Sequence, residues 1–236
     1  MKSNILYEDE VLLIVDKPSN IPCYPLKEGE TNTLANALLA YAPQLSQVGD
    51  GLDAGIVHRL DNTTTGVLVV AKTNEVYQKL RAIWNQSGIK KQYRAFVYGI
   101  VPQKIDIGFP IAHHPKNKKK MVVCSSEKQA REFKARPAET SAVRQRIFQL
   151  SKNEAVSEVL VTICTGVRHQ IRVHLAFAGY PLVGDALYQK KITAGLARFK
   201  RPLLNLAHIE MGHPVTGQII KISSKGDSDF NFFDQI

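Results

Sequence analysis

The chain has 236 residues, of which 44% are hydrophobic and 22% are charged, so it is long enough to bury a core and falls in the range of globular proteins. Its 31 basic and 21 acidic residues give a net charge of +10, which favours a polyanionic partner, either nucleic acid or an anionic membrane surface. The apolar run 11–15 is too short to span a membrane and follows three acidic residues, which argues against a signal peptide and predicts a cytoplasmic protein.

The three cysteines, Cys23, Cys124 and Cys164, are widely spaced and form no C-x-x-C pair. An odd number with this spacing predicts neither a disulfide framework nor a zinc site. We therefore expect buried, unreactive thiols.

The first strand and the first helix are both marked by proline. The apolar run 11–15 stops before Pro18 and predicts a buried strand, and the residues after it, 17–31, predict a loop. Thr33 is a suitable N-cap for a helix with one apolar stripe, which ends before Pro43.

A second strand and helix follow a polar segment. Residues 44–55 are rich in Gly, Asp and Ser and predict a loop, whereas the apolar run 67–71 predicts a buried strand. Apolar residues between Val76 and Trp84 recur at helical spacing and predict an amphipathic helix that is terminated by Gly88.

The second half of the chain begins with a strand at 93–97, where apolar and polar residues alternate. Residues 110–131 surround a basic tract and predict a mobile loop, before further strands at 147–150 and 159–163 and a helix at 168–177. Strands and helices are interleaved without a βαβ rhythm, so we expect an α+β fold.

The segment 58–66, with the sequence HRLDNTTTG, places one acid, Asp61, among a cation and several hydroxyls directly before a buried strand. Nearby positive charge and hydrogen bonds favour an ionised carboxylate, as a catalytic acid residue requires. The alternative is a turn in which Asp61 and Asn62 bond to their own backbone.

The segment 165–174, TGVRHQIRVH, leads through a glycine turn into the last predicted helix. Arg168 and Arg172 are four residues apart and would share a helical face, where they could clamp a phosphate or pair with a buried carboxylate, or form a solvated basic face. His169 and His174 are five apart, which does not match the helical zinc pattern, so no metal site is predicted.

Lys91 and Tyr93 open a strand and point to the same side, which could present a phenol beside a cation. A core tyrosine with a surface lysine would give the same pattern. The chain contains no P-loop, no G-x-G-x-x-G and no G-x-S-x-G motif.

Taken in order, these segments resemble the RluA-type family of RNA pseudouridine synthases, from about Ile14 to Gly217. The family motifs K-P-x-G, H-R-L-D-x-x-T-S-G, K-x-Y, T-G-R-x-H-Q-I-R-V-H, G-x-P-x-x-G-D-x-x-Y and H-P-x-T-G correspond to residues 17–20, 58–66, 91–93, 165–174, 179–188 and 213–217. The H-R-L-D and H-Q-I-R-V-H strings are specific when they occur together at this separation.

The resemblance implies that Asp61 is the catalytic nucleophile, that Tyr93 is the active-site tyrosine and that Arg172 pairs with Asp61. It also implies that Arg59 enters the RNA stack vacated by a flipped uridine. The expected RNA-binding residues are His58, Arg59, Lys91, Lys116, Lys118, Lys119, Lys120, Arg168 and His169.

The implied fold is α+β, with a mixed, largely antiparallel sheet flanked by helices and two lobes around a central active-site cleft. We expect one catalytic domain over residues 1–236, with no separate S4-like domain. The implied reaction needs no cofactor, and the implied partner is a stem-loop of ribosomal RNA or tRNA. We expect the protein to be a monomer. The sequence does not choose between these two RNAs.

Four positions depart from the family pattern: Asn20 replaces a glycine, Thr65 a serine, Val167 an arginine and Asn205 a histidine. Two other functions remain open at this stage. An RNA glycoside hydrolase would use Asp61 with a second acid such as Asp53. An RNA-binding or ribosome-assembly protein would need only the basic surface.

Overall fold

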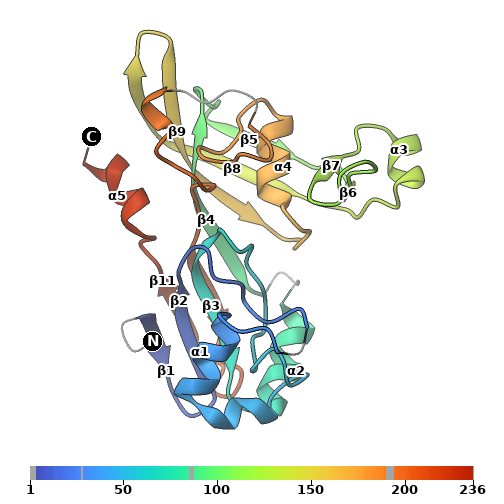
Figure 1. Ribbon diagram of the computed structural model, residues 1–236, viewed down its shortest axis with the longest axis vertical. Coiled ribbons are helices and arrows are strands. Elements are labelled where there is room, and N and C mark those ends of the chain that lie inside the picture. The colour runs from blue at the N-terminus through green and yellow to red at the C-terminus, as the bar shows by residue number, and fades with distance from the viewer. Residues whose placement is uncertain (1–3, 28, 85–87, 190–193, 236) are drawn as a thin grey trace. The chain divides into compact units, whose positions relative to one another are not determined.

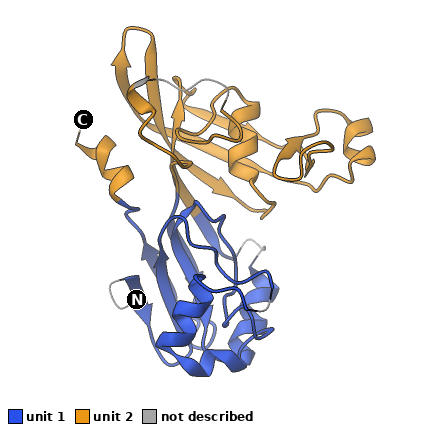
Figure 2. Cartoon of the chain, viewed as in Figure 1, with its two compact units in different colours: residues 1–91, 205–227 blue, residues 92–204, 228–236 orange. Residues whose placement is uncertain are grey.

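A computed structural model of the protein describes residues 4–27, 29–84, 88–189 and 194–235. The chain divides into two compact units: unit 1 comprises residues 1–91 and 205–227, and unit 2 comprises residues 92–204 and 228–236 (Figure 2). Each unit combines strands with a few helices, and most strand pairs are antiparallel (Figure 1). This confirms the expected α+β fold.

Unit 1 is built on a sheet with the strand order β1-β2-β3-β10, and β11 pairs with β10. Neighbouring strands are antiparallel except for β3 and β10, which run parallel. The strands are β1 (Ile5–Glu8), β2 (Leu12–Lys17), β3 (Thr65–Ala71), β10 (Leu204–Gly212) and β11 (Ile219–Ser223).

The core of unit 1 follows from the two continuous apolar runs. All seven residues of β3 and five of the six residues of β2 are buried, as expected for strands without an exposed face. The helices α1 (Leu34–Tyr41) and α2 (Asn74–Ile83) lie beside these strands in Figure 1. Thr33 caps α1 through a capping box with Asn36, which confirms the predicted start of this helix.

Unit 2 is built on an antiparallel sheet with the strand order β4-β9-β8-β5. A separate hairpin of β6 and β7, together with a short helix α3, forms an extension of this unit (Figure 1). The elements are β4 (Lys90–Tyr98), β5 (Lys104–Ile107), β6 (Ile111–His113), β7 (Met121–Val123), α3 (Glu127–Glu132), β8 (Thr140–Ser151) and β9 (Glu154–Ile163).

Two further helices complete unit 2. The helix α4 (Gln170–Phe177) packs against β7 and β8. The C-terminal helix α5 (Ser228–Asp234) inserts Phe230 and Phe233 into an aromatic core around Phe96. The rings of Phe96 and Phe233 stack with centroids 4.2 Å apart, so α5 is part of the core.

The structure corrects three of the expectations from the sequence. The predicted loop 110–131 contains β6, β7 and α3, because short strands and a helix of six residues leave little periodic signal. The last predicted helix begins at Gln170 instead of Arg168. Cys164 is exposed, whereas Cys23 and Cys124 are buried as expected.

Two short helical turns, at Pro43–Gln47 and Ala194–Leu196, are of the 3-10 type. In the described part of the chain, no helix is both long enough and apolar enough to cross a membrane.

Candidate active site

Asp61 lies in a tight turn of unit 1, four residues before β3. Its backbone carbonyl accepts a hydrogen bond from the Thr64 amide at 3.0 Å, which closes the turn. The Asp61 side chain is partly exposed. A fixed backbone turn with an accessible carboxylate is a suitable arrangement for a reactive group.

A buried lysine holds this turn from one side. Lys17, at the end of β2, is fully buried, and its Nζ donates to the carbonyl oxygens of Pro18, Asn62 and Thr64 at 2.9, 3.0 and 2.9 Å. Two of these carbonyls belong to Asn62 and Thr64, which follow Asp61 within the turn. The ammonium of Lys17 therefore fixes the backbone around Asp61, a role that the K-P motif did not reveal.

His58 anchors the other side of the segment. Its Nε2 accepts a hydrogen bond from the Val69 amide at 3.1 Å, and its ring stacks on Trp84 with centroids 4.0 Å apart. Burial, together with the positive charge of Lys91, lowers the pKa of His58 to about 3. The imidazole is therefore neutral at physiological pH.

Lys91 is also buried, and its Nζ donates to the Trp84 carbonyl at 2.9 Å. His58 and Lys91 thus contact protein atoms, which favours a structural role over the RNA contact that the sequence suggested. Lys91 and Tyr93 are both buried on the same side of β4, as the alternation predicted, but Lys91 is not a surface lysine.

Two of the four departures from the family pattern touch each other. Thr65 Oγ1 donates to Asn205 Oδ1 at 2.8 Å, where β3 and β10 pair in parallel. Asn205 Nδ2 donates to the Ser224 carbonyl at 3.2 Å, and Ser224 Oγ donates to Asp16. This buried chain of hydrogen bonds ties the residue after the turn to β10 and β2.

Gly66, the last residue of the motif, adopts a φ of 117°, and a Cβ atom there would collide with the backbone N and O atoms of Leu206. Only glycine permits this approach of β3 to β10.

The other two departures from the family pattern, at positions 20 and 167, have local explanations. Asn20 has a φ of 60°, a conformation in which asparagine can replace glycine. Val167 is buried in an apolar cluster.

Arg59 is exposed two residues before Asp61. Its Nη1 lies 3.4 Å from the Tyr24 hydroxyl, and its Cζ lies 5.7 Å from the centre of the Tyr24 ring. Arg59 can therefore leave this contact without opening the core, as a side chain that enters an RNA stack requires.

Arg172 is buried in unit 2 and pairs with Asp185. Its Nε and Nη2 donate to the two carboxylate oxygens of Asp185 at 2.8 and 2.9 Å, a bidentate geometry that fixes the plane of the guanidinium. Asp185 belongs to the G-D-x-x-Y run at residues 179–188, a motif whose residues have no role predicted from the sequence.

The segment 165–174 and the run 179–188 also contact each other through His169. Its Nδ1 lies 2.9 Å from the Tyr188 hydroxyl, which also accepts a hydrogen bond from the Met121 amide at 2.8 Å. His169 is buried and has a left-handed φ of 54° just before α4. Tyr188 therefore joins the start of α4 to β7. The expected RNA contact of His169 stays a prediction.

Arg168 precedes α4 and is exposed, so it does not share a helical face with the buried Arg172 as the sequence predicted. Its Nη1 lies 3.4 Å from the Lys118 carbonyl. The structure thus brings Arg168 to the lysine loop, which we define as residues 114–120 between β6 and β7.

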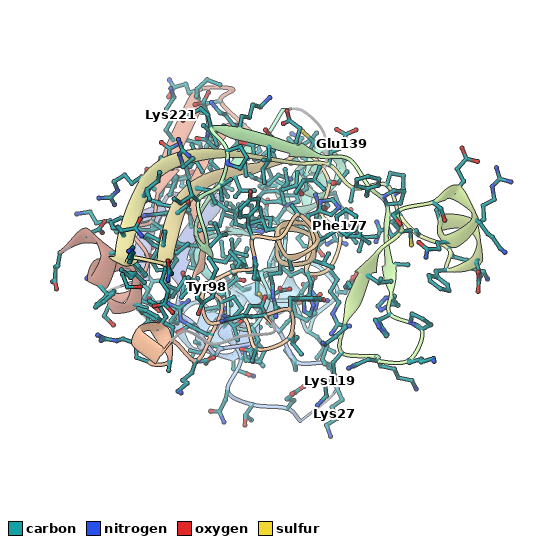
Figure 3. All side chains as sticks on the ribbon, turned by 90° about the horizontal axis from the view of Figure 1, so that it is seen from above. Lys27, Tyr98, Lys119, Glu139, Phe177 and Lys221 are labelled. Carbon is teal, nitrogen blue, oxygen red and sulfur yellow. The ribbon has the colours of Figure 1, made fainter. Side chains whose placement is uncertain are left out.

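The lysine loop is organised by turns. His114 and Lys120 are joined by a backbone hydrogen bond, and the Lys119 amide donates to the Asn117 side chain. The side chains of Lys116, Lys118 and Lys119 are exposed, and that of Lys120 is partly exposed. Figure 3 shows Lys119 extending away from the ribbon.

Tyr93 is buried on β4, where it lies opposite Val161 of β9. Tyr93 and Arg172 belong to unit 2, whereas Asp61 belongs to unit 1. The approach of these three residues to one another stays a prediction.

Among the described residues, no group of three His, Cys, Asp or Glu side chains is placed to hold a metal ion. Asp53, the second acid of the hydrolase alternative, accepts a hydrogen bond from the Tyr77 hydroxyl at 2.6 Å. This contact gives Asp53 a partner within unit 1.

Comparison with known proteins shows a consistent set of relatives. Residues 11–177 match the family model of RNA pseudouridylate synthases. The chain is 36% identical over 236 residues to "Ribosomal large subunit pseudouridine synthase D" of Pseudomonas aeruginosa, covering 96% of this chain and 69% of the relative. It is 38% identical over 221 residues to the protein of the same name from Nitrosomonas europaea, covering 92% of this chain and 60% of the relative.

Solved structures show the same fold. "Human RNA Pseudouridylate Synthase Domain Containing 1" superposes with a TM-score of 0.73 at 22% identity, covering 94% of this chain and 82% of that chain. "Human RNA Pseudouridylate Synthase Domain Containing 4" gives the same TM-score and identity, covering 98% and 91%.

We expect Lys17→Met to destabilise unit 1. Methionine fills a similar volume but leaves the carbonyls of Pro18, Asn62 and Thr64 without the ammonium, so the free energy of unfolding should fall by about 2–4 kcal/mol. Urea denaturation measures this change. Lys79→Met, which removes an exposed lysine of α2, is the matched control and should change little. Equal stability of the two variants would contradict the role of Lys17.

The lowered pKa of His58 predicts a loss of stability in acid. The unfolded chain takes up a proton near pH 6.5, whereas folded His58 does so only near pH 3, so stability is complete above pH 6.5 and declines as the pH falls towards 3. By pH 4.5 this residue should cost about 2–3 kcal/mol. Denaturation curves between pH 7 and pH 4.5 should fall more steeply for the wild type than for His58→Gln, and parallel curves would refute the assignment.

Proposed function

Because this chain belongs to the RNA pseudouridylate synthase family, we propose that Asp61 is the nucleophile with which it converts specific uridines of RNA to pseudouridine. The observation that carries this assignment is the turn around Asp61, whose flanking backbone is fixed by the buried ammonium of Lys17. A nucleophile must be held in one geometry while the base turns, and this turn supplies that constraint.

The proposed substrate is large-subunit ribosomal RNA. The sequence left ribosomal RNA and tRNA open, and the bacterial relatives named above carry the name of a ribosomal large subunit synthase. The chain spans 60–69% of the length of these two relatives. The target uridine and the share of substrate recognition that lies in this chain are therefore part of the proposal.

The reaction breaks the glycosidic bond, turns the uracil within the site and rejoins it through carbon 5, without net oxidation or hydrolysis. Asp61 attacks the ribose or the uracil ring, and Tyr93 helps to remove the proton from carbon 5. The proposal includes no cofactor. It treats the two units as one catalytic domain that acts as a monomer.

In this proposal Arg172 stabilises the ionised carboxylate of Asp61, as the family pattern implies. Asp185 is a positioning residue for Arg172, because its bidentate contact with Nε and Nη2 fixes one edge of the guanidinium. A fixed guanidinium loses less entropy when it binds a further anion, so Asp185 contributes to catalysis through Arg172.

Access to a uridine in a stem-loop requires that the nucleotide is flipped out of its stack, which costs a few kcal/mol. Arg59 is the residue proposed to fill the gap, since it is exposed and, within the described part of the chain, is held by a contact with Tyr24. The lysine loop and Arg168 together form a basic surface that is proposed to bind phosphates.

We expect Asp61→Ala and Asp61→Asn to reduce pseudouridine formation by about 10⁴-fold or more, since each removes the nucleophile. Purified protein is incubated, with EDTA present, with unmodified large-subunit ribosomal RNA and separately with tRNA, and pseudouridine is then mapped chemically. Asp106→Asn, an exposed acid of β5, is the matched control and should retain full activity.

Each failure of this experiment has a distinct meaning. Activity that survives both Asp61 substitutions would refute Asp61 as the nucleophile. Release of free uracil would indicate a glycoside hydrolase. A silent wild type that still binds RNA tightly would favour an RNA-binding or assembly protein.

We expect that replacing Lys116, Lys118, Lys119 and Lys120 with alanine will weaken RNA binding and flatten its salt dependence. The slope of log K against log salt concentration should decrease by about three units, since each of the four lost phosphate contacts removes about 0.7–0.9. Binding isotherms at several salt concentrations measure this slope.

The matched control replaces four exposed lysines elsewhere, Lys79, Lys104, Lys152 and Lys221, and so removes the same charge. If both quadruple variants change the slope equally, the effect comes from net charge and the lysine loop has no specific role in binding.

A further inference from the structure

Tyr188 contacts three residues of unit 2 with two different parts of its side chain. Its ring lies under the Arg172 guanidinium, and its hydroxyl contacts His169 and the backbone amide of Met121. We propose that Tyr188 is a positioning residue with two separable roles: the ring aligns Arg172 for catalysis, and the hydroxyl holds the lysine loop for RNA binding. The inference rests on the proposed function and deepens it by assigning a role to the last residue of the run 179–188.

The ring of Tyr188 restricts a motion that Asp185 leaves open to Arg172. Asp185 accepts hydrogen bonds from Nε and Nη2 and so holds one edge of the guanidinium. A guanidinium bound along one edge can still tilt about that edge, because hydrogen bonds to sp² oxygens tolerate a broad range of angles. The centre of the Tyr188 ring lies 5.4 Å from Cζ of Arg172, within the range of a cation–π contact. Contacts along an edge and across a face together fix the plane of the guanidinium.

Burial strengthens this contact between ring and cation. The Arg172 side chain is buried, and Tyr188 packs against an apolar cluster that includes Met121 and Val173. A cation–π contact contributes more when the cation is removed from water. Loss of the ring would therefore leave Arg172 without a contact that solvent does not replace.

The hydroxyl of Tyr188 binds the backbone at the end of the lysine loop. It accepts a hydrogen bond at 2.8 Å from the amide of Met121, the first residue of β7. The preceding residue, Lys120, accepts a backbone hydrogen bond from the His114 amide at 3.1 Å, which closes the loop. The lysine loop therefore ends at a residue that is anchored to Tyr188.

The same hydroxyl contacts the start of α4. It lies 2.9 Å from Nδ1 of His169, which has a left-handed φ of 54°. A histidine in this conformation is uncommon and persists where the surrounding structure holds it. The neighbouring Arg168 directs its guanidinium to the Lys118 carbonyl. The two parts of the proposed phosphate-binding surface, the lysine loop and Arg168, thus adjoin residues that contact one hydroxyl.

The turn that carries Tyr188 is itself fixed. The Tyr188 amide donates to the Asp185 carbonyl at 3.2 Å. Gly184 has a φ of 79°, and a Cβ atom there would collide with the backbone carbonyl of Arg201, so only glycine permits this approach. The short segment 184–188 is therefore a rigid support for both the guanidinium and the loop.

Tyr188→Phe tests the hydroxyl, because phenylalanine keeps the ring and removes both hydroxyl contacts. We expect RNA binding to weaken about fivefold to tenfold and its salt slope to become shallower, since the Met121 amide loses its acceptor and the lysine loop its anchored end. The kcat at saturating RNA should change less than about twofold. Tyr180→Phe, which removes the hydroxyl of another partly exposed tyrosine of unit 2, is the matched control and should keep the wild-type affinity and slope.

Tyr188→Leu and Tyr188→pentafluorophenylalanine test the ring. Leucine removes the contact with the face of the Arg172 guanidinium, whereas fluorination keeps the shape of phenylalanine and makes the face of the ring repel a cation. Compared with Tyr188→Phe, each should lower kcat about tenfold in single-turnover assays, while KM changes little. Urea denaturation shows whether each variant is folded, and the fluorinated variant decides the result if the leucine variant unfolds.

A double-mutant cycle shows whether the ring acts through Arg172. Arg172→Lys keeps a positive charge but has no guanidinium plane to align. Tyr188→Leu should therefore lower kcat less than about twofold in the Arg172→Lys background, in contrast to its effect in the wild type.

The outcomes separate this inference from the proposed function. Wild-type affinity and salt slope in Tyr188→Phe would overturn the role of the hydroxyl. An equal loss of kcat from Tyr188→Leu in both backgrounds, or equal kcat values for the phenylalanine and pentafluorophenylalanine variants, would show that the ring is only structural and would overturn its role. Absence of pseudouridine from every RNA would overturn the proposed function and with it the role of the ring, whereas the binding measurements would decide the role of the hydroxyl separately.

Discussion

The hydrogen bonds of the Lys17 ammonium are the interaction on which the turn around Asp61 depends. The ammonium lies at the end of the buried strand β2 and replaces its lost hydration with three carbonyl oxygens, two of them from residues beside Asp61. Burying a charge is costly unless it is satisfied, so the turn and the lysine stabilise each other. The position of Asp61 is therefore coupled to the core of unit 1.

The segment 58–66, which contains Asp61, is held at its two ends by contacts of different kinds. His58 is a neutral acceptor for β3 and stacks on Trp84, and the Cys23 thiol packs against the backbone of Leu60. At the other end, Thr65 is bonded to Asn205. The segment is thus held near its two ends by His58 and Thr65, whereas Arg59 and Asp61 between them remain accessible.

In unit 2, two motifs that are distant in sequence form one structure. Arg172 of α4 binds Asp185, and His169 before α4 contacts Tyr188, so residues 185–188 fix both the start of the helix and its buried arginine. The departures from the family pattern can be understood in the same terms. Thr65 and Asn205 bond to each other, so two changes that look independent in the sequence form a single contact.

The sequence by itself determined the fold class, the strands β2 and β3, the cap of α1 and the identity of the candidate nucleophile. These features are local: continuous apolar runs, capping residues and contiguous motifs are visible without a partner. The tertiary structure decided which polar residues are buried. His58, Lys91 and His169 were expected to bind RNA, but the structure buries each of them against protein atoms. Lys17, which the sequence placed at the start of a loop, is also buried, and two of its three carbonyl partners, those of Asn62 and Thr64, are distant in sequence. Charge and periodicity carry no information on such long-range contacts, so only the folded chain separates the polar residues that are buried from those that remain exposed.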